Sequence, residues 1–458
     1  MKPPARLTLT GTLTPAQALT YLYLPFEVPE GIGQIDVQYS YSDAIAADPG
    51  LSGGSTIDIG IFDAGGIGFS SGGFRGWSGS ARRAFSIGRD SATPGYMPGP
   101  IPAGTWHICL GAYKVAAQGC AYRVSIDLIP SAAANQTAFP PRLTLDDGKR
   151  IPRRADGWYS GEMHCHTVNS DGDSTAAEIV ALAETAGFDF LAVTDHNTLT
   201  QQVDLARITT PLLLIPGLEV TTYFGHWNVW GGGRWIDFRV QQPADLERAI
   251  AFARAQGCLI SCNHPRPYGP DWAFPEVGGF ACVEVWNGPW ELLNSASLAF
   301  WEARLMRGER LVAVGGSDHH FSHRPHIARL GFPTLRVYVA PDRAPTARGI
   351  LDAIRAGHCH ITEAPDGPSV TLNAGGSMMG DRLPRPAEDQ IALDLNVTGG
   401  TGGTLQLVGS DGILAEADIT HDNQPLHLVL KLDGSLYLRA QLADSGQMRV
   451  LTNPIYFG

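Results

Sequence analysis

The sequence predicts an α/β protein in which a central (β/α) barrel lies between two β-sandwiches. Two observations predict this fold. Short runs at both ends of the chain alternate apolar and polar residues, whereas continuous apolar runs alternate with helical patterns in the middle third. A third observation, metal-ligating side chains at the ends of the apolar runs, is typical of a barrel mouth. A length of 458 residues is typical of two to four domains.

The two terminal regions are predicted to be antiparallel β-sandwiches. Residues 1–150 are rich in Gly, Ser and Pro, and runs such as GQIDVQYSYS, STIDIGIFDA and CAYRVSIDLI alternate with period two. The same pattern returns in residues 365–458, in DQIALDLNV, LHLVLKL and SLYLRAQLA. The second region is shorter, so we expect a smaller sandwich there.

Residues 151–364 have the pattern of a parallel sheet covered by helices. The first helix carries a capping box, because Thr175 precedes the helical spacing and Glu178 follows three residues later. Apolar strands such as FDFLAV, LLLIPGLEV, CLISC, CVEV and LVAVGG lie between the helical patterns. Six or seven such units predict a closed or nearly closed barrel. The helical patterns cover 174–186, 243–257, 297–307 and 344–356.

Composition limits the partners and the compartment. The formal charge of −12 argues against nucleic acid, because phosphate backbones require a basic surface. No apolar run reaches the ~18 residues of a membrane span, and the N-terminal residues lack the apolar run of a signal peptide. The seven cysteines form no paired motif. We therefore expect a cytoplasmic protein that acts on a small molecule. The composition leaves open whether the protein forms an oligomer.

Metal-ligating side chains follow almost every predicted strand of the middle region. Eleven of the 14 histidines lie between residues 157 and 363, and the carboxyl ends of barrel strands face one mouth. Alternation allows both histidines of the HCH motif at 164–166 to point inward. Imidazole and carboxylate together hold Zn²⁺, Mn²⁺ or Fe²⁺ and leave positions open for substrate. The predicted ligands are His164, His166, Asp171, His196, Glu219, His264, Asp318 and His320.

Other polar residues are expected to support these ligands or to have no part in the site. One carboxylate usually bridges the ions of such a centre, and Glu219 is the candidate. Asp195, Glu284 and Asn263 are predicted to orient ligands from behind, although Asp195 and Glu284 could themselves be ligands. Five further histidines are expected to be ordinary polar residues: His107, His358, His360, His421 and His427.

These motifs resemble those of the PHP (polymerase and histidinol phosphatase) superfamily of metallohydrolases. The similarity lies in HCHTVNSDG from 164, TDHN from 194, GLE from 217, NHP from 263 and GGSDHH from 315, and covers about 157–363. Within that superfamily the sequence looks most like the CehA/McbA-like branch. The features that indicate this branch are GHWNVWG after the glutamate, EVWNG at 284–288 and TNPIYF at 452–457.

The resemblance implies a distorted (β/α)7 PHP barrel with two or three divalent metal ions (Zn, Mn or Fe). It adds His226 to the ligands, because the local pattern alone predicts only a loop histidine there. One departure from the family is Glu162, where aspartate is frequent. The resemblance implies three ligand groups: His164, His166, Glu219 and Asp318; Glu219, His226 and His264; and Asp171, His196 and His320.

The predicted reaction is metal-dependent hydrolysis of a phosphomonoester or phosphodiester, in which a metal-bound hydroxide formed from water attacks phosphorus. Residues 157–363 contain no lysine, so arginine must supply any cationic contact to phosphate. Arg266 is the best-placed arginine and Arg324 the second, with His323 and Tyr268 as further substrate contacts. His320, His323 or a metal-bound water could protonate the leaving group.

Two other functions stay open. The same site could hydrolyse a carboxylic ester or carbamate, and aromatic residues near the predicted mouth suit an aryl group. The sandwiches could instead bind carbohydrate or a protein partner around a degenerate barrel, although the intact ligand set argues against this. The aromatic residues are Tyr223, Phe224, Trp227, Tyr268, Trp272, Trp286 and Trp290.

Overall fold

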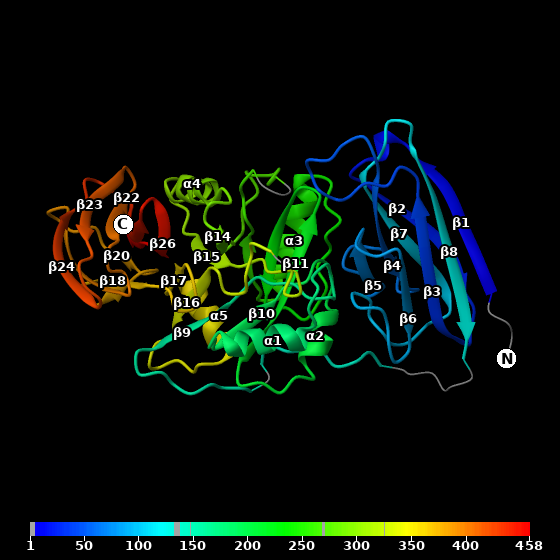
Figure 1. Cartoon of the computed structure of the whole chain (residues 1–458), viewed down its shortest axis with the longest axis horizontal. Coiled ribbons are helices and arrows are strands. Elements are labelled where there is room, and N and C mark those ends of the chain that lie inside the picture. Colours follow the sequence, from blue (N-terminus) through cyan, green and yellow to red (C-terminus); the bar gives the residue numbers. More distant parts are fainter. Residues whose placement is uncertain (1–4, 132–137, 147, 268–270, 325) are drawn as a thin grey trace.

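The computed structural model describes residues 5–131, 138–146, 148–267, 271–324 and 326–458. Three groups of elements follow one another along the long axis of the molecule (Figure 1). We call β1–β8 the N-terminal unit, β9–β17 with the helices the central unit, and β18–β27 the C-terminal unit. No helix within the described ranges is long and apolar enough to cross a membrane.

The N-terminal unit consists of two antiparallel four-stranded sheets with the orders β1-β8-β3-β6 and β2-β7-β4-β5. They enclose one core because alternate residues of each strand point inward, as Ile57, Ile59 and Ile61 do on β4. This is the layered arrangement that the period-two pattern predicts. The strands are β1 (Ala5–Leu13), β2 (Tyr21–Val28), β3 (Ile32–Tyr41), β4 (Thr56–Phe62), β5 (Phe74–Gly79), β6 (Ala84–Gly88), β7 (Gly104–Lys114) and β8 (Cys120–Pro130).

The outer face of the sheet β2-β7-β4-β5 is buried as well. All seven residues of β4 are buried, which a sandwich strand with one face in water would not show. Phe62 and Cys109 from this face belong to the core of the central unit, where Phe62 packs edge-on against Trp235. The N-terminal unit therefore contacts the central unit through a sheet face.

The described residues of the central unit form five α-helices, four of which the sequence predicts. The Thr175 hydroxyl accepts a hydrogen bond from the Glu178 amide and Glu178 bonds back, so the predicted capping box starts the first helix. The short helix after Leu199 was not expected. The helices are α1 (Ala176–Thr185), α2 (Thr200–Leu205), α3 (Pro243–Ala255), α4 (Asn294–Leu305) and α5 (Ala347–Ala356).

The central sheet is mixed, which corrects the expectation of an all-parallel sheet. Strands β9, β10 and β11 are parallel, and so are β13, β14 and β15. Strand β12, however, is antiparallel to both neighbours, because Thr222 and Gly225 close a tight turn from β11. The strands are β9 (Trp158–Glu162), β10 (Phe190–Val193), β11 (Leu213–Thr222), β12 (Gly225–Trp230), β13 (Leu259–Cys262), β14 (Cys282–Asn287), β15 (Val312–Gly316), β16 (Thr334–Tyr338) and β17 (Cys359–Thr362).

The two ends of this sheet approach each other. The order runs from β15 through β9 to β16 and β17, and β15 lies close to β16 and β17. Strand β16 pairs antiparallel with both β9 and β17. Within the described residues no ladder joins β15 to β16 or β17. A mixed α/β unit is present, and closure into a (β/α)7 barrel stays a prediction.

The C-terminal unit continues the central sheet, because β26 pairs with β17. A second sheet, β19-β18-β21-β24, packs on this extension, and both share a core that includes Val370, Leu407 and Leu442. The strands are β18 (Ser369–Ala374), β19 (Ser377–Met378), β20 (Arg382–Leu383), β21 (Gln390–Thr398), β22 (Thr404–Gly409), β23 (Gly412–Asp418), β24 (Gln424–Lys431), β25 (Tyr437–Asp444), β26 (Gln447–Thr452) and β27 (Ile455–Phe457).

Candidate metal centre

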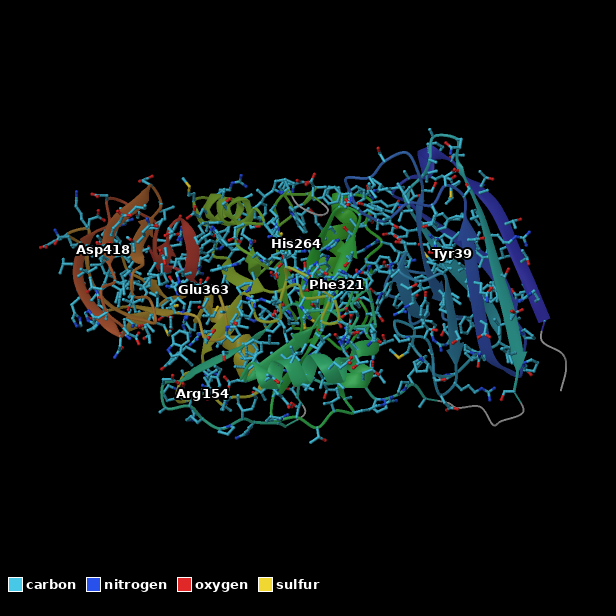
Figure 2. The ribbon with its side chains drawn as sticks, viewed as in Figure 1. Tyr39, Arg154, His264, Phe321, Glu363 and Asp418 are labelled. Atoms are coloured by element: carbon cyan, nitrogen blue, oxygen red, sulfur yellow. The ribbon has the colours of Figure 1, made fainter. Side chains whose placement is uncertain are left out.

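The structure brings all nine candidate ligands together in the central unit, where Figure 2 labels His264 between Tyr39 of the N-terminal strands and Asp418 of the C-terminal strands. They come from the ends of four strands (β9, β10, β13 and β15), from within β11 and β12, and from the loop before α1. Parallel strands end at one edge of a sheet, which explains why residues so distant in sequence meet. The nine residues are His164, His166, Asp171, His196, Glu219, His226, His264, Asp318 and His320.

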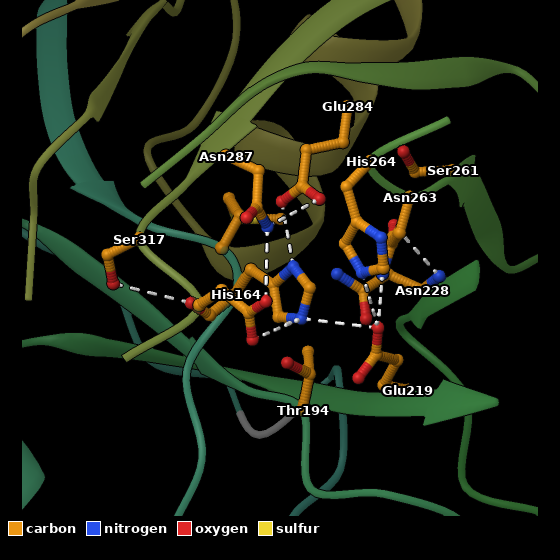
Figure 3. A network of polar contacts seen from close by, with 12 residues as sticks. His164, Thr194, Glu219, Asn228, Ser261, Asn263, His264, Glu284, Asn287 and Ser317 are labelled. Atoms are coloured by element: carbon orange, nitrogen blue, oxygen red, sulfur yellow. Dashed lines mark hydrogen bonds and ion pairs between the residues drawn. The ribbon is translucent and has the colours of Figure 1, made fainter. Parts of the chain in front are cut away.

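Glu219 lies at the centre of this cluster. Its Oε1 is 3.4 Å from His164 Nε2, and also 3.4 Å from both His226 Nδ1 and His264 Nε2. Its Oε2 is 2.8 Å from His196 Nδ1. Figure 3 shows His164 and His264 pointing to this carboxylate from two sides. One carboxylate therefore faces imidazoles from four different strands or strand ends, which is the position expected of a bridging ligand.

The other two acids complete separate groups. Asp318 Oδ1 lies 3.4 Å from His164 Nε2 and 3.0 Å from His166 Nε2. Asp171 Oδ1 lies 3.5 Å from His196 Nε2 and 3.3 Å from His320 Nε2. Three sets have ligand atoms within 4.8 Å of one another: His166, Asp171, His196 and His320; His164, His166 and Asp318; and His196, Glu219 and His226. They match the groups implied by the motifs in part, because Glu219 is absent from the set with His164, His264 belongs to none of the three, and His166 and His196 each belong to two.

The spacing of these atoms suits cations better than direct hydrogen bonds. Most of the nitrogen–oxygen separations are 3.3–3.5 Å, whereas an N–H···O bond has a separation of ~2.7–3.2 Å. Ligands ~2.1 Å from a tetrahedral ion lie ~3.4 Å apart. The Nε2 atoms of His164 and His166 are also buried without a hydrogen bond. Buried polar atoms need a partner, and a divalent cation would supply one here.

Buried polar residues hold the ligands in place. Glu284 Oε1 lies 2.7 Å from His164 Nδ1, which leaves Nε2 for the cluster. Asn263 Nδ2 donates to Glu219 Oε1 at 2.9 Å (Figure 3). Asn287, which the sequence analysis did not select, donates to both Glu284 and Asp318. Its only sequence signal was its place in the EVWNG motif.

Burial and charge shift the ligands in two directions: the pKa values of Glu219 and His166 are lowered, whereas for His164 and His320 the neighbouring acids outweigh burial and raise the pKa. Burial would raise the pKa of Glu219, but the surrounding imidazoles, His164 first, outweigh it and hold the pKa well below its usual range. Burial, together with the neighbouring His320 and His196, lowers the pKa of His166 to about 3. The carboxylate and the neutral imidazole are the forms that bind metal ions.

Strained backbone and close packing occur at the same place. Asn197, His264 and Asp318 have positive φ angles of 56°, 31° and 53°, and such conformations cluster at functional sites. Close packing also explains why the second residue of the GGSDHH motif, Gly316, is a glycine. A Cβ at Gly316 would lie 2.4 Å from the Cβ of His164, so a larger residue would displace that ligand.

Glu162, the departure from the family pattern, has a structural position. Its Oε1 accepts hydrogen bonds from the amides of Met163, His164 and Ser317, and its Oε2 from that of Gly331. The side chain is buried. Four N–H donors thus satisfy a buried carboxylate that joins the end of β9 to the loop after β15.

The predicted substrate contacts have different positions. Arg324 lines the cavity above the cluster, with its guanidinium 3.4 Å from the Phe321 ring centroid. Arg266 also lines it, but is buried and donates to Asn287 and Asn294. His323 lies away from the cavity, because its exposed imidazole pairs with Glu178 on α1. Tyr268 lies outside the described residues.

Asp195 and the predicted aromatic wall also differ from the expectation. The Asp195 carboxylate accepts hydrogen bonds from Thr167 and Ser170, so it shapes the loop that leads to Asp171 instead of holding an imidazole. Of the aromatic residues expected at the mouth, Tyr223 lines the cavity, whereas Trp227 and Trp286 are buried in the core.

The cavity above the cluster has a volume of about 1080 Å³, large enough for a small-molecule substrate. Its floor contains five of the candidate ligands: Asp171, His196, His226, Asp318 and His320. A second wall comes from the N-terminal unit, with Tyr21, Asp58, Trp77 and Tyr113. No signal in the sequence indicated that this distant sheet reaches the site.

Comparisons with known proteins show limited similarity. No family model and no curated protein matches the chain. A two-domain protein from Bacteroides vulgatus containing a predicted PHP-like metal-dependent phosphoesterase is 17% identical, with 69% of this chain and 99% of that chain covered at a TM-score of 0.35.

Two further solved structures match a smaller part. A proposed metal-dependent phosphoesterase from Bifidobacterium adolescentis is 17% identical, with 42% of this chain and 94% of that one covered at a TM-score of 0.28. An amidohydrolase from Chromobacterium violaceum with bound sulfate and no metal is 16% identical, with 44% and 97% covered at a TM-score of 0.28. Similarity at this level does not decide the function.

Proposed function

We propose that the protein is a metal-dependent phosphoesterase of the PHP type, with Glu219 as the bridging ligand of a centre with two or three divalent ions. The single observation that carries this proposal is the cluster of six imidazoles and three carboxylates, in which the Glu219 carboxylate faces His164, His196, His226 and His264 at 2.8–3.4 Å. The motif resemblance, including its CehA/McbA-like features, supports the same assignment. We propose three domains: a β-sandwich in residues 1–150, the (β/α)7 barrel in residues 151–364 and a second β-sandwich in residues 365–458.

The charge of the cluster favours an anionic substrate. Two divalent ions would bring four positive charges, and three would bring six. The three carboxylates offset only three of them, so a net positive site would face the cavity. When bound, such ions polarise a phosphoryl oxygen and lower the pKa of a coordinated water. Phosphoesters carry the negative charge that this site would attract.

The chain itself has two tasks in this reaction. Glu284 and Asn263 hold His164 and Glu219 in place. These two ligands are at most 1% exposed, so they lie fixed beneath the residues that line the cavity. His196, His320 and Asp171 keep 19%, 16% and 45% of their side chains exposed, so this group faces the substrate. His320 Nδ1 lies 2.8 Å from the Asp318 carbonyl, which turns Nε2 toward the ion position, so the proton for the leaving group would come from a coordinated water.

Arginine contacts to phosphate divide between two residues. Arg324 lies at the cavity wall with its guanidinium over Phe321, so it is the cation that a substrate phosphate meets. The Arg266 guanidinium donates to Asn287, whose amide contacts Asp318. We therefore propose that Arg266 positions Asp318 through Asn287, in addition to the contact with substrate phosphate that the sequence suggests.

A carboxylic ester or carbamate hydrolase is the second candidate, because the N-terminal wall of the cavity presents Tyr21, Trp77 and Tyr113 to any substrate. Such a wall suits an uncharged aryl ester as well as an aryl phosphate. The ligand set is the same for both reactions, so only a comparison of substrates separates them.

The test combines metal analysis with paired substrates. We expect elemental analysis of the purified protein to show two or three Zn, Mn or Fe ions per chain, and 4-nitrophenyl phosphate to be hydrolysed faster than 4-nitrophenyl acetate. Glu219→Gln should lower the metal content and reduce kcat/KM by at least about 100-fold. Glu276→Gln, an exposed glutamate, is the matched control and should change neither. Acetate turnover without phosphatase activity would favour the second candidate, and a protein that takes up no metal would exclude both.

A further inference from the structure

The outer face of the N-terminal sheet forms one side of the catalytic cavity. On β7, Trp106, Ile108 and Leu110 point into the core of the N-terminal unit, so Gly111 and Tyr113 belong to the opposite face. Tyr21 on β2 and Asp58 on β4 share that face by the same alternation. Four strands that are distant in sequence from every candidate ligand, β2, β4, β5 and β7, therefore contribute residues to the wall.

A stack of three tyrosines ties this wall to the metal cluster. Tyr223, four residues after Glu219, lies between Tyr21 and Tyr113, with ring centroids 5.4 and 5.3 Å away. Its hydroxyl donates to Asp58 Oδ2 at 2.7 Å. The stack needs Gly111, because a Cβ there would lie 2.1 Å from the Tyr223 hydroxyl. The wall is thus held at a defined distance from the ligand strand β11.

The chemistry of the wall suits an uncharged flat group. Among the described lining residues, those of the N-terminal unit include no lysine or arginine, and they include three aromatic rings, three alanines and a proline. Burial raises the pKa of Asp58 to about 7, so this carboxyl is partly neutral at neutral pH. The exposed Asp48 lies beside Lys114, whose Nζ donates to the Asp48 and Leu51 carbonyls, so the two charges offset each other at this edge of the cavity. Ring edges attract the face of another aromatic ring.

The opposite wall has the complementary character. Arg324 and the candidate ligands Asp171 and His320 lie on the central unit side of the same cavity. A substrate that spans the cavity would therefore meet cationic groups at one end and aromatic rings at the other. The tyrosine faces in the stack are occupied by each other and by the Lys114 ammonium, 5.3 Å from the Tyr113 ring centroid, which argues against recognition of a further organic cation by those faces.

We propose that the substrate is a phosphoester of an aromatic alcohol without a second charged group, and that the N-terminal unit binds its aromatic part through the wall of Tyr21, Trp77 and Tyr113. This inference rests on the proposed phosphoesterase function and names the substrate class and its specificity-determining residues. Tyr113 is the residue to test, because it is only half-buried and its loss leaves the sandwich core intact.

The experiment measures binding and turnover separately in the metal-loaded full-length protein. We expect 4-methylumbelliferone, an aromatic alcohol, to bind by fluorescence titration, and Tyr113→Ala to weaken this binding about fivefold. The same variant should raise KM for 4-methylumbelliferyl phosphate by about the same factor, and should raise KM for glycerol phosphate much less. Tyr41→Ala, a half-buried tyrosine on the other sheet, is the control and should change none of these values.

The two proposals fail in different ways. If phosphoesters are hydrolysed but Tyr113→Ala leaves both binding of the alcohol and KM unchanged, the aromatic wall is not the recognition surface and this inference is overturned. If the alcohol binds in a Tyr113-dependent way but no phosphoester is hydrolysed, the phosphoesterase proposal is wrong and the recognition surface stands. Equal KM values for the aryl and glycerol substrates in the wild type would also contradict the inference.

Discussion

The two flanking β-units have the same sequence pattern but different relations to the metal cluster. The N-terminal unit contacts the central unit through a sheet face and lines the cavity with Tyr21, Asp58 and Tyr113. The C-terminal unit extends the central sheet edge to edge through β26, and none of its described residues lines that cavity. A face can present side chains to a substrate, whereas a paired edge uses backbone groups and supports the strands it joins.

Asn453 shows how the C-terminal unit supports the site. Its side chain bonds to both backbone groups of Ala313 on β15 and to the carbonyl of Cys359 on β17. It therefore links the two strands between which the described residues form no ladder. This contact gives a physical role to the TNPIYF motif, and β15 leads directly to Asp318.

The largest effect that separates the two units is expected for Asn453→Ala. The substitution leaves buried backbone groups of β15 and β17 without partners, so the free energy of unfolding should fall by about 4 kcal/mol. Urea unfolding would measure this loss, with the more accessible Asn396→Ala as the control. KM for an aryl phosphate should stay the same in the folded fraction, and a change in KM would show that the C-terminal unit also shapes the cavity.

The second prediction concerns Asp58 in the N-terminal unit. Because burial raises its pKa from 3.8 to about 7, folding takes up a proton between these values. Its contribution to stability is therefore complete below about pH 4 and is lost as the pH rises through 7. Asn cannot ionise, so Asp58→Asn should gain stability relative to the wild type across this window, by about 3 kcal/mol at pH 8.

Thermal or urea unfolding of both proteins from pH 4 to 8 measures this difference. The exposed Asp90→Asn is the control and should show no such gain. A pH-independent difference between Asp58→Asn and the wild type would mean that the carboxyl does not titrate in the folded protein as expected.

The third prediction tests the tyrosine stack. Gly111→Ala would place a methyl group 2.1 Å from the Tyr223 hydroxyl and 2.9 Å from the Trp77 ring, so the wall must shift. We expect a loss of about 2 kcal/mol in stability and a higher KM for aryl phosphates. Gly68→Ala, where a Cβ meets nothing within 4 Å, is the matched control. Unchanged KM in Gly111→Ala would separate the stack from substrate recognition.

The smallest effect is expected at the surface of the C-terminal unit. His427 pairs with Asp394 at 2.7 Å, but both side chains are mostly exposed, at 76% and 66%. His427→Ala should change the free energy of unfolding by less than about 0.5 kcal/mol and leave metal content and KM unchanged. A larger loss would show that the exposed face of this unit has a role beyond support.

Local patterns predicted many helices and strands of the molecule, because these elements depend on nearby residues. The capping box of Thr175 and Glu178 starts α1, and the alternating runs form the two N-terminal sheets. The direction of β12 could not be predicted in the same way. Its antiparallel pairing depends on the tight turn at 222–225, and the aromatic sequence TTYFGHW has no strong turn signal.

The candidate ligands and the substrate contacts differ in the same respect. Eight of the nine ligand candidates could be selected from residue type and from their positions after apolar strands, whereas His226 required the family resemblance. Arg266 was chosen because it lies close to His264 in sequence, yet its guanidinium turns to Asn287 and Asn294. Proximity along the chain does not decide where a long side chain points.

The sequence by itself determined the types of ligand, the strand ends that carry them and the two alternating β-regions, because periodicity and residue chemistry are local properties. Only the tertiary structure decided that Tyr21, Asp58 and Tyr113 reach the cavity, that Asn453 joins β15 and β17, and that His323 lies away from the site. These contacts join residues far apart in the chain, and their geometry depends on which sheet faces and edges pack together.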